Sequence, residues 1–303
     1  MEKFDLHILG CGSALPTTHH HPSAQVVDLR DKLFMIDCGE GAQLQMRRSR
    51  LKFSRLNHIF ISHIHGDHCF GLIGVISTFA LLGRTADLHV YGPATLEPVL
   101  RLQLSTFCPG LEFNVDFHPT TPEYALIYED RSVQVYTLPL RHRVPCTGFL
   151  FCERPILPHI RRDMIDFYHI PLYAIRTIKE GADWELPDGT VIPNERLVRP
   201  ADPPRRYAYC SDTAYLPSLV RYVEGVDLLF HEATFGADNQ ARAAETLHST
   251  AEQAATLARD AGVRRLVIGH YSARYEDEHV LLNEAQAIFP QTVLAQEGLR
   301  LQV

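Results

Sequence analysis

The sequence lacks the marks of a secreted or membrane-spanning protein. No basic stretch followed by an apolar core opens the chain, so no secretory signal peptide is predicted. The longest apolar stretch, residues 69–83, is shorter than the ~20 residues that a membrane span needs, and it contains Ser77, Thr78 and several glycines. We therefore expect a buried, packed helix there and no membrane partner.

Paired cysteines are also missing. The seven cysteines are scattered, odd in number and form no Cys-x-x-Cys pair. Such a pattern suits buried free thiols in a reducing cytoplasm. No fixed-period repeat and no low-complexity linker divides the chain either, so residues 1–303 are predicted to form a single domain.

Positive charge is scarce overall. The 29 lysines and arginines against 36 acidic residues give a formal net charge of −7, a mild argument against a nucleic-acid partner. Binding depends on local patches, however, and residues 42–65 contain no acid. The basic residues of this run are Arg47, Arg48, Arg50, Lys52 and Arg55. The run is either a solvated helix face or a phosphate contact.

Short β-type runs alternate with helical candidates along the chain. Runs rich in Val, Ile, Tyr and Phe predict strands at 7–9, 26–29, 33–36, 58–61, 88–91, 133–138, 149–151, 207–210, 227–230 and 265–268. Helices are predicted at 40–50, 71–82, 217–223 and 251–261. The last has a start signal, Ser249-x-x-Glu252, and a stop signal, Gly262. This alternation indicates an α/β protein built in layers.

Residues 153–206 break this pattern. The segment is rich in proline and charge, its periodicity is weak, and residues 184–189 are typical of a small hairpin turn. We expect it to be an insertion that projects from the main body of the domain.

Histidine is unusually abundant, with seventeen in the chain. The densest group is His63-Ile64-His65-Gly66-Asp67-His68, directly after the predicted strand 58–61. These side chains can converge on a tight loop, for which Gly66 supplies backbone freedom. Imidazoles and a carboxylate without cysteine suit Zn²⁺ or another borderline divalent ion.

Further ligands are expected at the ends of other strands, where sites in such sheets collect. His142, Asp212 and His270 each follow a predicted strand. Together with the dense motif they offer too many ligands for one four-coordinate ion. Two ions bridged by a carboxylate would use them all. The triplet His19-His20-His21 lies in a Pro- and Thr-rich turn region and is interpreted as a loop near the mouth of the site.

The His-x-His-x-Asp-His motif followed by the later His, Asp and His resembles the metallo-β-lactamase superfamily. Other motifs, in the same order, resemble its ribonuclease Z family: residues 10–17 (GCGSALPT), 37–41 (DCGEG), 231–234 (HEAT), 248–250 (HST) and 272–275 (SARY). The resemblance covers nearly the whole chain. It implies a four-layer αββα sandwich, two Zn²⁺ per chain, a homodimer in the cytoplasm, and cleavage of precursor tRNA just 3′ of the discriminator base. It implies that the tRNA keeps a 3′-hydroxyl and the trailer a 5′-phosphate.

The resemblance also implies a role for each matching residue. One zinc would be held by His63, His65 and His142, and the other by Asp67, His68 and His270, with Asp212 as the bridge. Asp67 would also be the proton acceptor. His248 would be the general acid and Glu232 its partner. Taken alone, His248 would more often be a capping-region side chain and Glu232 a solvated loop acid.

The inserted segment matches the arm with which this family grips the tRNA elbow, but it departs from the family pattern. That arm usually carries a Gly-Pro motif, whereas residues 169–176 have Pro171 without the neighbouring glycine. We therefore expect different contacts with the RNA.

Two other functions compete with tRNA processing. One is a hydrolase of the same fold for small phosphodiesters, thioesters or lactones, which would have no use for a projecting arm. The other is a non-catalytic RNA-binding module, which the full ligand set disfavours. A di-iron redox enzyme is disfavoured because that branch typically has Glu in the position of His65.

Overall fold

The computed structural model describes residues 2–303. The chain divides into two compact units, one formed by residues 2–152 and 205–303 and the other by residues 153–204. The first unit contains two seven-stranded sheets, and the second contains two short strand pairs with three helices.

The first sheet has the strand order β18-β1-β2-β3-β4-β5-β6. Its strands are β1 (Phe4–Gly10), β2 (Ala24–Leu29), β3 (Lys32–Cys38), β4 (Leu56–Phe60), β5 (Leu88–Pro93), β6 (Val115–Thr120) and β18 (Arg300–Gln302). Strands β18 to β3 are antiparallel to their neighbours, whereas β3 to β6 run parallel. The parallel half brings the carboxyl ends of β3 and β4 to the same edge of the sheet.

The second sheet has the order β17-β16-β15-β14-β9-β8-β7. Its strands are β7 (Leu126–Glu129), β8 (Val133–Pro139), β9 (Thr147–Glu153), β14 (Arg206–Cys210), β15 (Leu228–Glu232), β16 (Leu266–Gly269) and β17 (Thr292–Leu294). Strands β14 to β17 are parallel to one another, so β14, β15 and β16 also end at a common edge.

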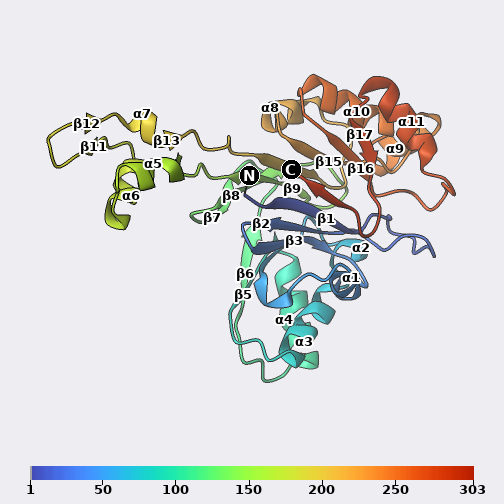
Figure 1. Cartoon of the computed structure of the whole chain (residues 1–303). Helices are drawn as coiled ribbons and strands as arrows, with labels where there is room; N and C mark the ends of the chain where they lie inside the picture. Colours follow the sequence, from blue (N-terminus) through green and yellow to red (C-terminus); the bar gives the residue numbers. More distant parts are fainter. Residues whose placement is uncertain (1) are drawn as a thin grey trace. The chain divides into compact units, whose positions relative to one another are not determined.

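Helices cover the outer faces of both sheets (Figure 1). Beside the first sheet are α1 (Ala42–Arg48), α2 (Gly66–Cys69), α3 (Leu72–Leu81), α4 (Leu96–Phe107) and the 3-10 turn η1 (Phe53–Arg55). Beside the second are η2 (Pro217–Leu219), α8 (Val220–Val223), η3 (Ala237–Asn239), α9 (Gln240–Thr246), α10 (Ala251–Asp260) and α11 (His279–Ile288). The expected αββα sandwich is confirmed.

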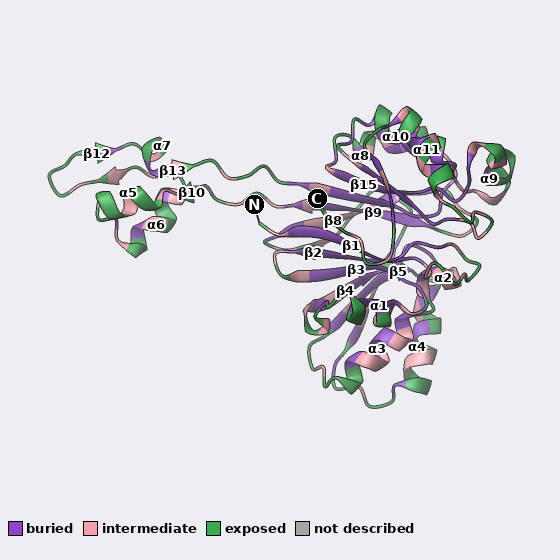
Figure 2. Ribbon diagram, turned by 45° about the vertical axis from the view of Figure 1, so that its right-hand side comes forward, coloured by how far each residue is buried: buried purple, intermediate pink, exposed green. Residues whose placement is uncertain are grey.

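Successive side chains of a strand point to opposite faces of the sheet, and this alternation creates two separate cores in this unit. On β3, Phe34 and Ile36 belong to the core between the sheets, whereas Leu33 and Met35 belong to the core under α1, α3 and α4. Figure 2 shows the buried strands at the centre and exposed residues on the outer faces of the helices. Within residues 2–303, no helix is long and apolar enough to cross a membrane.

The second unit has a small core of its own. Strand β10 (His159–Ile160) pairs with β13 (Val198–Arg199), and β11 (Trp184–Glu185) pairs with β12 (Val191–Ile192). The expected hairpin is thus confirmed. Helices α5 (Arg162–Phe167), α6 (Leu172–Lys179) and α7 (Asn194–Leu197) complete the unit. Its buried residues are Ile170, Ala174, Ile178, Ile192 and Leu197.

Two local expectations were wrong. Helix α3 buries only one face, because Leu81 and Leu82 at its end are 86% and 57% exposed. Helix α10 has its N-cap at Thr250, one residue later than expected, and its capping box pairs Thr250 with Gln253. The hydroxyl of Ser249 donates instead to the Thr213 carbonyl at 2.8 Å and cannot cap the helix.

Candidate metal centre

The dense histidine motif lies where β4 ends and the short helix α2 begins. Residues 61–65 form the connecting loop, and His65 is the N-cap of α2. Gly66 does not supply backbone freedom as expected, because its φ is not positive. A Cβ atom at this position would lie 2.2 Å from the ring of Phe70, an exposed side chain that would have to move aside. The motif therefore spans a loop-to-helix junction.

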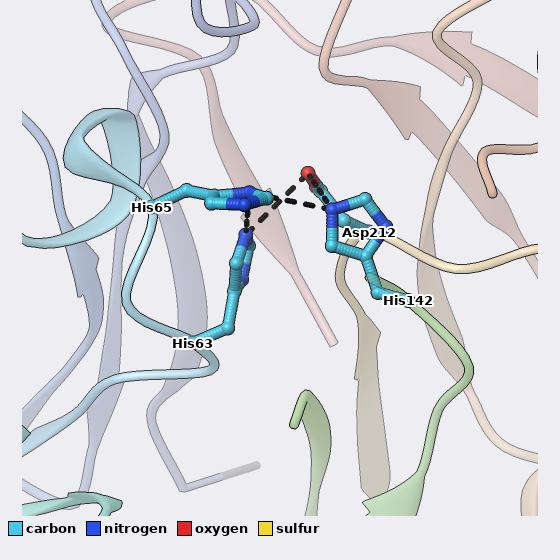
Figure 3. A group of neighbouring side chains, drawn as sticks. All are labelled: His63, His65, His142 and Asp212. Atoms are coloured by element: carbon cyan, nitrogen blue, oxygen red, sulfur yellow. Dashed lines mark hydrogen bonds and ion pairs between the residues drawn. The ribbon is translucent and has the colours of Figure 1, made fainter. Parts of the chain in front are cut away.

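The first group of ligand-type atoms comes from His63, His65, His142 and Asp212, whose atoms all lie within 4.8 Å of one another. His65 Nδ1 is 3.0 Å from His63 Nε2 and 3.3 Å from His142 Nε2. Asp212 Oδ2 is 3.6 Å from His63 Nε2 and 3.8 Å from His142 Nε2. Figure 3 shows the three rings and the carboxylate pointing toward a common centre.

The second group contains Asp67, His68 and His270. Asp67 Oδ2 is 3.3 Å from the Nε2 atoms of both His68 and His270, which are themselves 3.3 Å apart. The other oxygen of Asp212, Oδ1, completes the group at 3.4 Å from His68 Nε2 and 3.2 Å from His270 Nε2. Asp212 therefore offers one oxygen to each group.

The spacing of these atoms fits metal coordination better than hydrogen bonding. Zinc–nitrogen bonds of 2.0–2.1 Å arranged tetrahedrally place neighbouring ligand atoms about 3.3 Å apart. The separations of 3.0–3.8 Å in the two groups bracket this value. Asp212 Oδ1 is buried and accepts no hydrogen bond, although two imidazole nitrogens lie close to it. A cation between these atoms would satisfy all of them.

Hydrogen bonds behind the ligands fix the tautomers of the imidazoles. Thr234 gives its hydroxyl proton to Glu232 and so accepts from His270 Nδ1 at 2.8 Å. The Leu247 carbonyl accepts from His142 Nδ1 at 3.0 Å. In both histidines Nε2 is therefore left with its lone pair toward the centre, as metal ligation requires.

Asp37 is the supporting residue that the sequence left without a role. Its Oδ2 accepts from His68 Nδ1 at 2.7 Å and from the Tyr209 hydroxyl at 2.6 Å. Ser62 donates to both oxygens, through its backbone nitrogen at 2.7 Å and its hydroxyl at 2.9 Å. Asp37 is buried and has a φ of +54°, within the motif 37–41 that carried part of the resemblance. A buried carboxylate directly behind a ligating histidine is a common way of orienting the ring.

The charge of the pocket favours cations. Burial opposes the charged form of His68, but the nearby carboxylates of Asp212, Asp37 and Asp67 outweigh it and raise the pKa of this imidazole well above its ordinary value. Burial lowers the pKa values of His63 and His142, and so keeps these two rings neutral. The carboxylates that favour a proton on His68 would equally favour a divalent ion, which would have to displace that proton in order to bind.

His248 and Glu232 form a hydrogen-bonded pair beside the second group. Glu232 is fully buried, so it is not a solvated acid, and its Oε1 accepts from His248 Nδ1 at 2.9 Å. Burial lowers the pKa of His248, but the charge and hydrogen bond of Glu232 overcome this effect, and Asp212 adds to them. The net result raises the pKa of His248 to about 9. Before any metal binds, the imidazole is therefore protonated at neutral pH.

A cavity of about 300 Å³ opens onto these groups. It is lined by ligand-type residues from both groups, by His248 and by three arginines, Arg143, Arg242 and Arg274. All seven residues predicted as ligands, Asp67 among them, and the two other predicted catalytic residues, His248 and Glu232, thus gather in one place.

The remaining candidates lie elsewhere. His231, the first residue of the motif 231–234, is a buried core histidine whose Nδ1 is hydrogen-bonded to the Glu232 carbonyl at 2.7 Å. His20 lies between Glu278 and Glu297, at 2.9 Å and 3.0 Å. In the basic run, Arg47, Arg48, Arg50 and Lys52 are exposed, whereas the half-buried Arg55 pairs with Asp31.

Comparison with known proteins is consistent with this geometry. A family model described as "Anti-Pycsar protein Apyc1" matches residues 4–150, and one described as "Beta-lactamase superfamily domain" matches residues 197–271. Ribonuclease Z of Bacteroides thetaiotaomicron is 66% identical over 300 residues, covering 99% of this chain and 95% of that protein. Ribonuclease Z of Porphyromonas gingivalis W83 is 56% identical over 302 residues, covering 99% of both. The crystal structure of human tRNase Z, short form (ELAC1), is similar over 99% of both chains, with a TM-score of 0.72 and 25% identity.

Proposed function

We propose that this chain, which belongs to the ribonuclease Z family, removes 3′ trailers from precursor tRNA by cutting 3′ of the discriminator base. The observation that carries the proposal is the pair of ligand groups joined by Asp212, with the His248–Glu232 pair beside them. This arrangement combines a place for a phosphodiester, a proton acceptor and a proton donor in one cavity.

The two groups suit two zinc ions per chain. His63, His65 and His142 would hold one and Asp67, His68 and His270 the other, with one Asp212 oxygen for each ion. Two divalent ions bound in this way supply an activated water and neutralise charge on the phosphate.

The protein's own residues direct the proton transfers. Asp67 Oδ2 lies 3.3 Å from two ligand nitrogens, where it would orient the attacking water and accept its proton. As the bond between phosphorus and O3′ breaks, the leaving oxygen develops negative charge and needs a proton. His248 holds that proton, since Glu232 keeps the imidazole charged. The tRNA would leave with a 3′-hydroxyl and the trailer with a 5′-phosphate.

We assign substrate binding to the inserted segment 153–206. Its helices α5 and α6 expose Phe167 (71%), Leu172 (84%) and Tyr173 (81%), and Arg176 on α6 is also exposed. Exposed aromatic rings beside a cation can stack on nucleobases, which gives this arm a way to bind RNA without the Gly-Pro motif.

We further propose a homodimer in the cytoplasm. The first unit exposes large apolar side chains on and near α3 and α4, among them Phe70, Leu81, Leu102 and Phe107, each at least 67% exposed. Exposed apolar surface of this kind is typical of an interface between chains.

The cysteines support the assignment to the cytoplasm. All seven are free, which suits a reducing compartment.

Incubation of zinc-loaded protein with a 3′-extended precursor tRNA tests the proposal, with bis(p-nitrophenyl) phosphate in a parallel reaction. We expect one RNA cut, after the discriminator base, and a trailer with a 5′-phosphate. Turnover of the small diester with no RNA cleavage would contradict the proposal and favour a small-substrate hydrolase of the same fold.

A further inference from the structure

Arg274 lies on the rim of the catalytic cavity, four residues after the ligand candidate His270. It is exposed, and the mechanism above gives it no task. The cavity has two other arginines, Arg143 and Arg242, so its mouth is basic in a protein whose net charge is −7. A local basic rim is where an RNA backbone would be held.

The guanidinium of Arg274 is held in position by neutral groups. Its Nη1 donates to Asn239 Oδ1 at 2.6 Å, and its Nε donates to Ser272 Oγ at 3.3 Å. The guanidinium carbon lies 5.1 Å from the ring centre of Phe235. Side-chain order that is already present in the free protein lowers the entropic cost of binding a ligand.

The charge of Arg274 is not neutralised by the protein. Within residues 2–303, no carboxylate forms an ion pair with it, whereas Arg242 pairs with Glu245 at 2.6 Å. Arg143 has only a 3.4 Å hydrogen bond to the Glu245 carbonyl, which fixes its guanidinium less firmly than the contacts of Arg274 do. Of the three arginines, Arg274 alone combines a fixed guanidinium with an uncompensated charge.

We propose that Arg274 binds a backbone phosphate next to the scissile one and thereby positions the RNA strand across the metal centre. This inference rests on the proposed function. A fixed guanidinium offers parallel N–H donors that match phosphate oxygens. The scissile phosphate itself belongs over the buried ligand groups, so a residue on the exposed rim reaches a neighbouring phosphate along the strand.

The first test compares Arg274→Gln with wild type on precursor tRNA and on bis(p-nitrophenyl) phosphate, which has no neighbouring phosphate. We expect kcat/KM for the RNA to fall at least tenfold more than kcat/KM for the small diester, mainly through KM. Arg274→Lys keeps the charge and should recover part of the loss. The matched control is Arg259→Gln, which removes an exposed arginine of α10 that pairs with Asp260. Equal losses on both substrates, or no loss on RNA, would overturn the inference.

The second test identifies the phosphate. Precursors are made with a neutral methylphosphonate at one linkage at a time on either side of the cleavage site. One substitution should weaken wild type about as much as Arg274→Gln does, and should have no further effect on that variant. Independent, multiplicative losses at every linkage would overturn the inference. If wild type leaves the unmodified precursor intact, the proposed function itself fails, and that result is distinct from either outcome for Arg274.

Discussion

Replacing Glu232 by Gln removes the charge that keeps His248 protonated while preserving the size of the side chain. The difference between the pKa of about 9 and the ordinary 6.5 corresponds to about 3 kcal/mol, at 1.36 kcal/mol for each pKa unit. Burial opposes the charged form of His248 and only Asp212 is left to raise its pKa, so the variant should have a pKa well below about 9. Divalent ions nearby would repel the imidazolium in wild type and in Glu232→Gln alike. We therefore predict the difference between the two His248 pKa values and not either value by itself.

The same substitution also disturbs buried hydrogen bonds. Oε1 of Glu232 accepts from the backbone nitrogens of Thr213 at 3.2 Å and Ser249 at 2.9 Å, and Oε2 accepts from the nitrogen of Thr234 at 2.9 Å. The amide group of Gln must face at least one of these donors, which is then left unsatisfied. We expect a loss of about 1–3 kcal/mol in the free energy of unfolding.

The assay is the pH dependence of kcat for precursor tRNA. A general acid works only while protonated, so cleavage falls as the pH rises through its pKa. In Glu232→Gln this alkaline limb should move to lower pH by about two pH units or more. Turnover of bis(p-nitrophenyl) phosphate should lack this shift, because p-nitrophenolate is a good leaving group that needs no proton. An unmoved alkaline limb in a folded, metal-loaded variant would refute the role of the pair.

Three further predictions concern other parts of the molecule. Asp67→Ala should lower phosphodiester cleavage by at least roughly 10³-fold, because it removes both a ligand and the proton acceptor. Replacing three arginines of the basic run, Arg47, Arg48 and Arg50, by Gln should weaken precursor binding. The slope of log affinity against log salt concentration should become shallower by up to about 0.9 for each phosphate that these arginines neutralise. His20→Gln should cost about 1.5–3 kcal/mol of stability at pH 6, since it removes hydrogen bonds to two carboxylates.

The His20 prediction has a defined pH dependence. The hydrogen bond to Glu297 raises the pKa of His20 in the folded protein, and Glu278 adds to it, although burial opposes both. The stabilisation is therefore complete below about pH 6.5 and is lost as the pH rises through the higher folded-state pKa. Thermal unfolding should show a smaller difference between His20→Gln and wild type at pH 9 than at pH 6. A difference that grows with pH would contradict this assignment.

The other two predictions have simple controls. Near-normal turnover by Asp67→Ala on either substrate would remove Asp67 from the mechanism. For the basic run, Arg259→Gln changes one exposed arginine elsewhere and should leave the salt slope unaltered. An unchanged slope in the triple variant as well would make the run an ordinary solvated face.

The metal ligands could be predicted because their signal is local and chemical. The motif 63–68 concentrates ligand residues after a strand, and His142, Asp212 and His270 each follow another strand, so a sheet that gathers strand ends brings them together. The role of Asp37 could not be predicted, since its contact with His68 spans 31 residues of sequence. The hydrogen bond from His142 to Leu247 uses a backbone carbonyl, so no side chain in the sequence could have indicated it.

The fold was predictable where strands are buried and less so at the edges. Strand β6 escaped prediction because only two of its six residues are buried and it contains Pro119, which an edge strand tolerates. Strands β17 and β18 have three residues each, too few for a pattern. At the start of α10, Ser249 and Thr250 both fit a capping box in sequence, and only the hydrogen bond of Ser249 to Thr213 decides between them.

A zinc titration of metal-free protein tests the central claim most directly, with cleavage of precursor tRNA as the readout. The account predicts no cleavage without metal, and a single cut after the discriminator base whose rate saturates at two zinc ions per chain. Saturation at one ion, or cleavage that persists in the metal-free protein, would contradict a dinuclear centre bridged by Asp212.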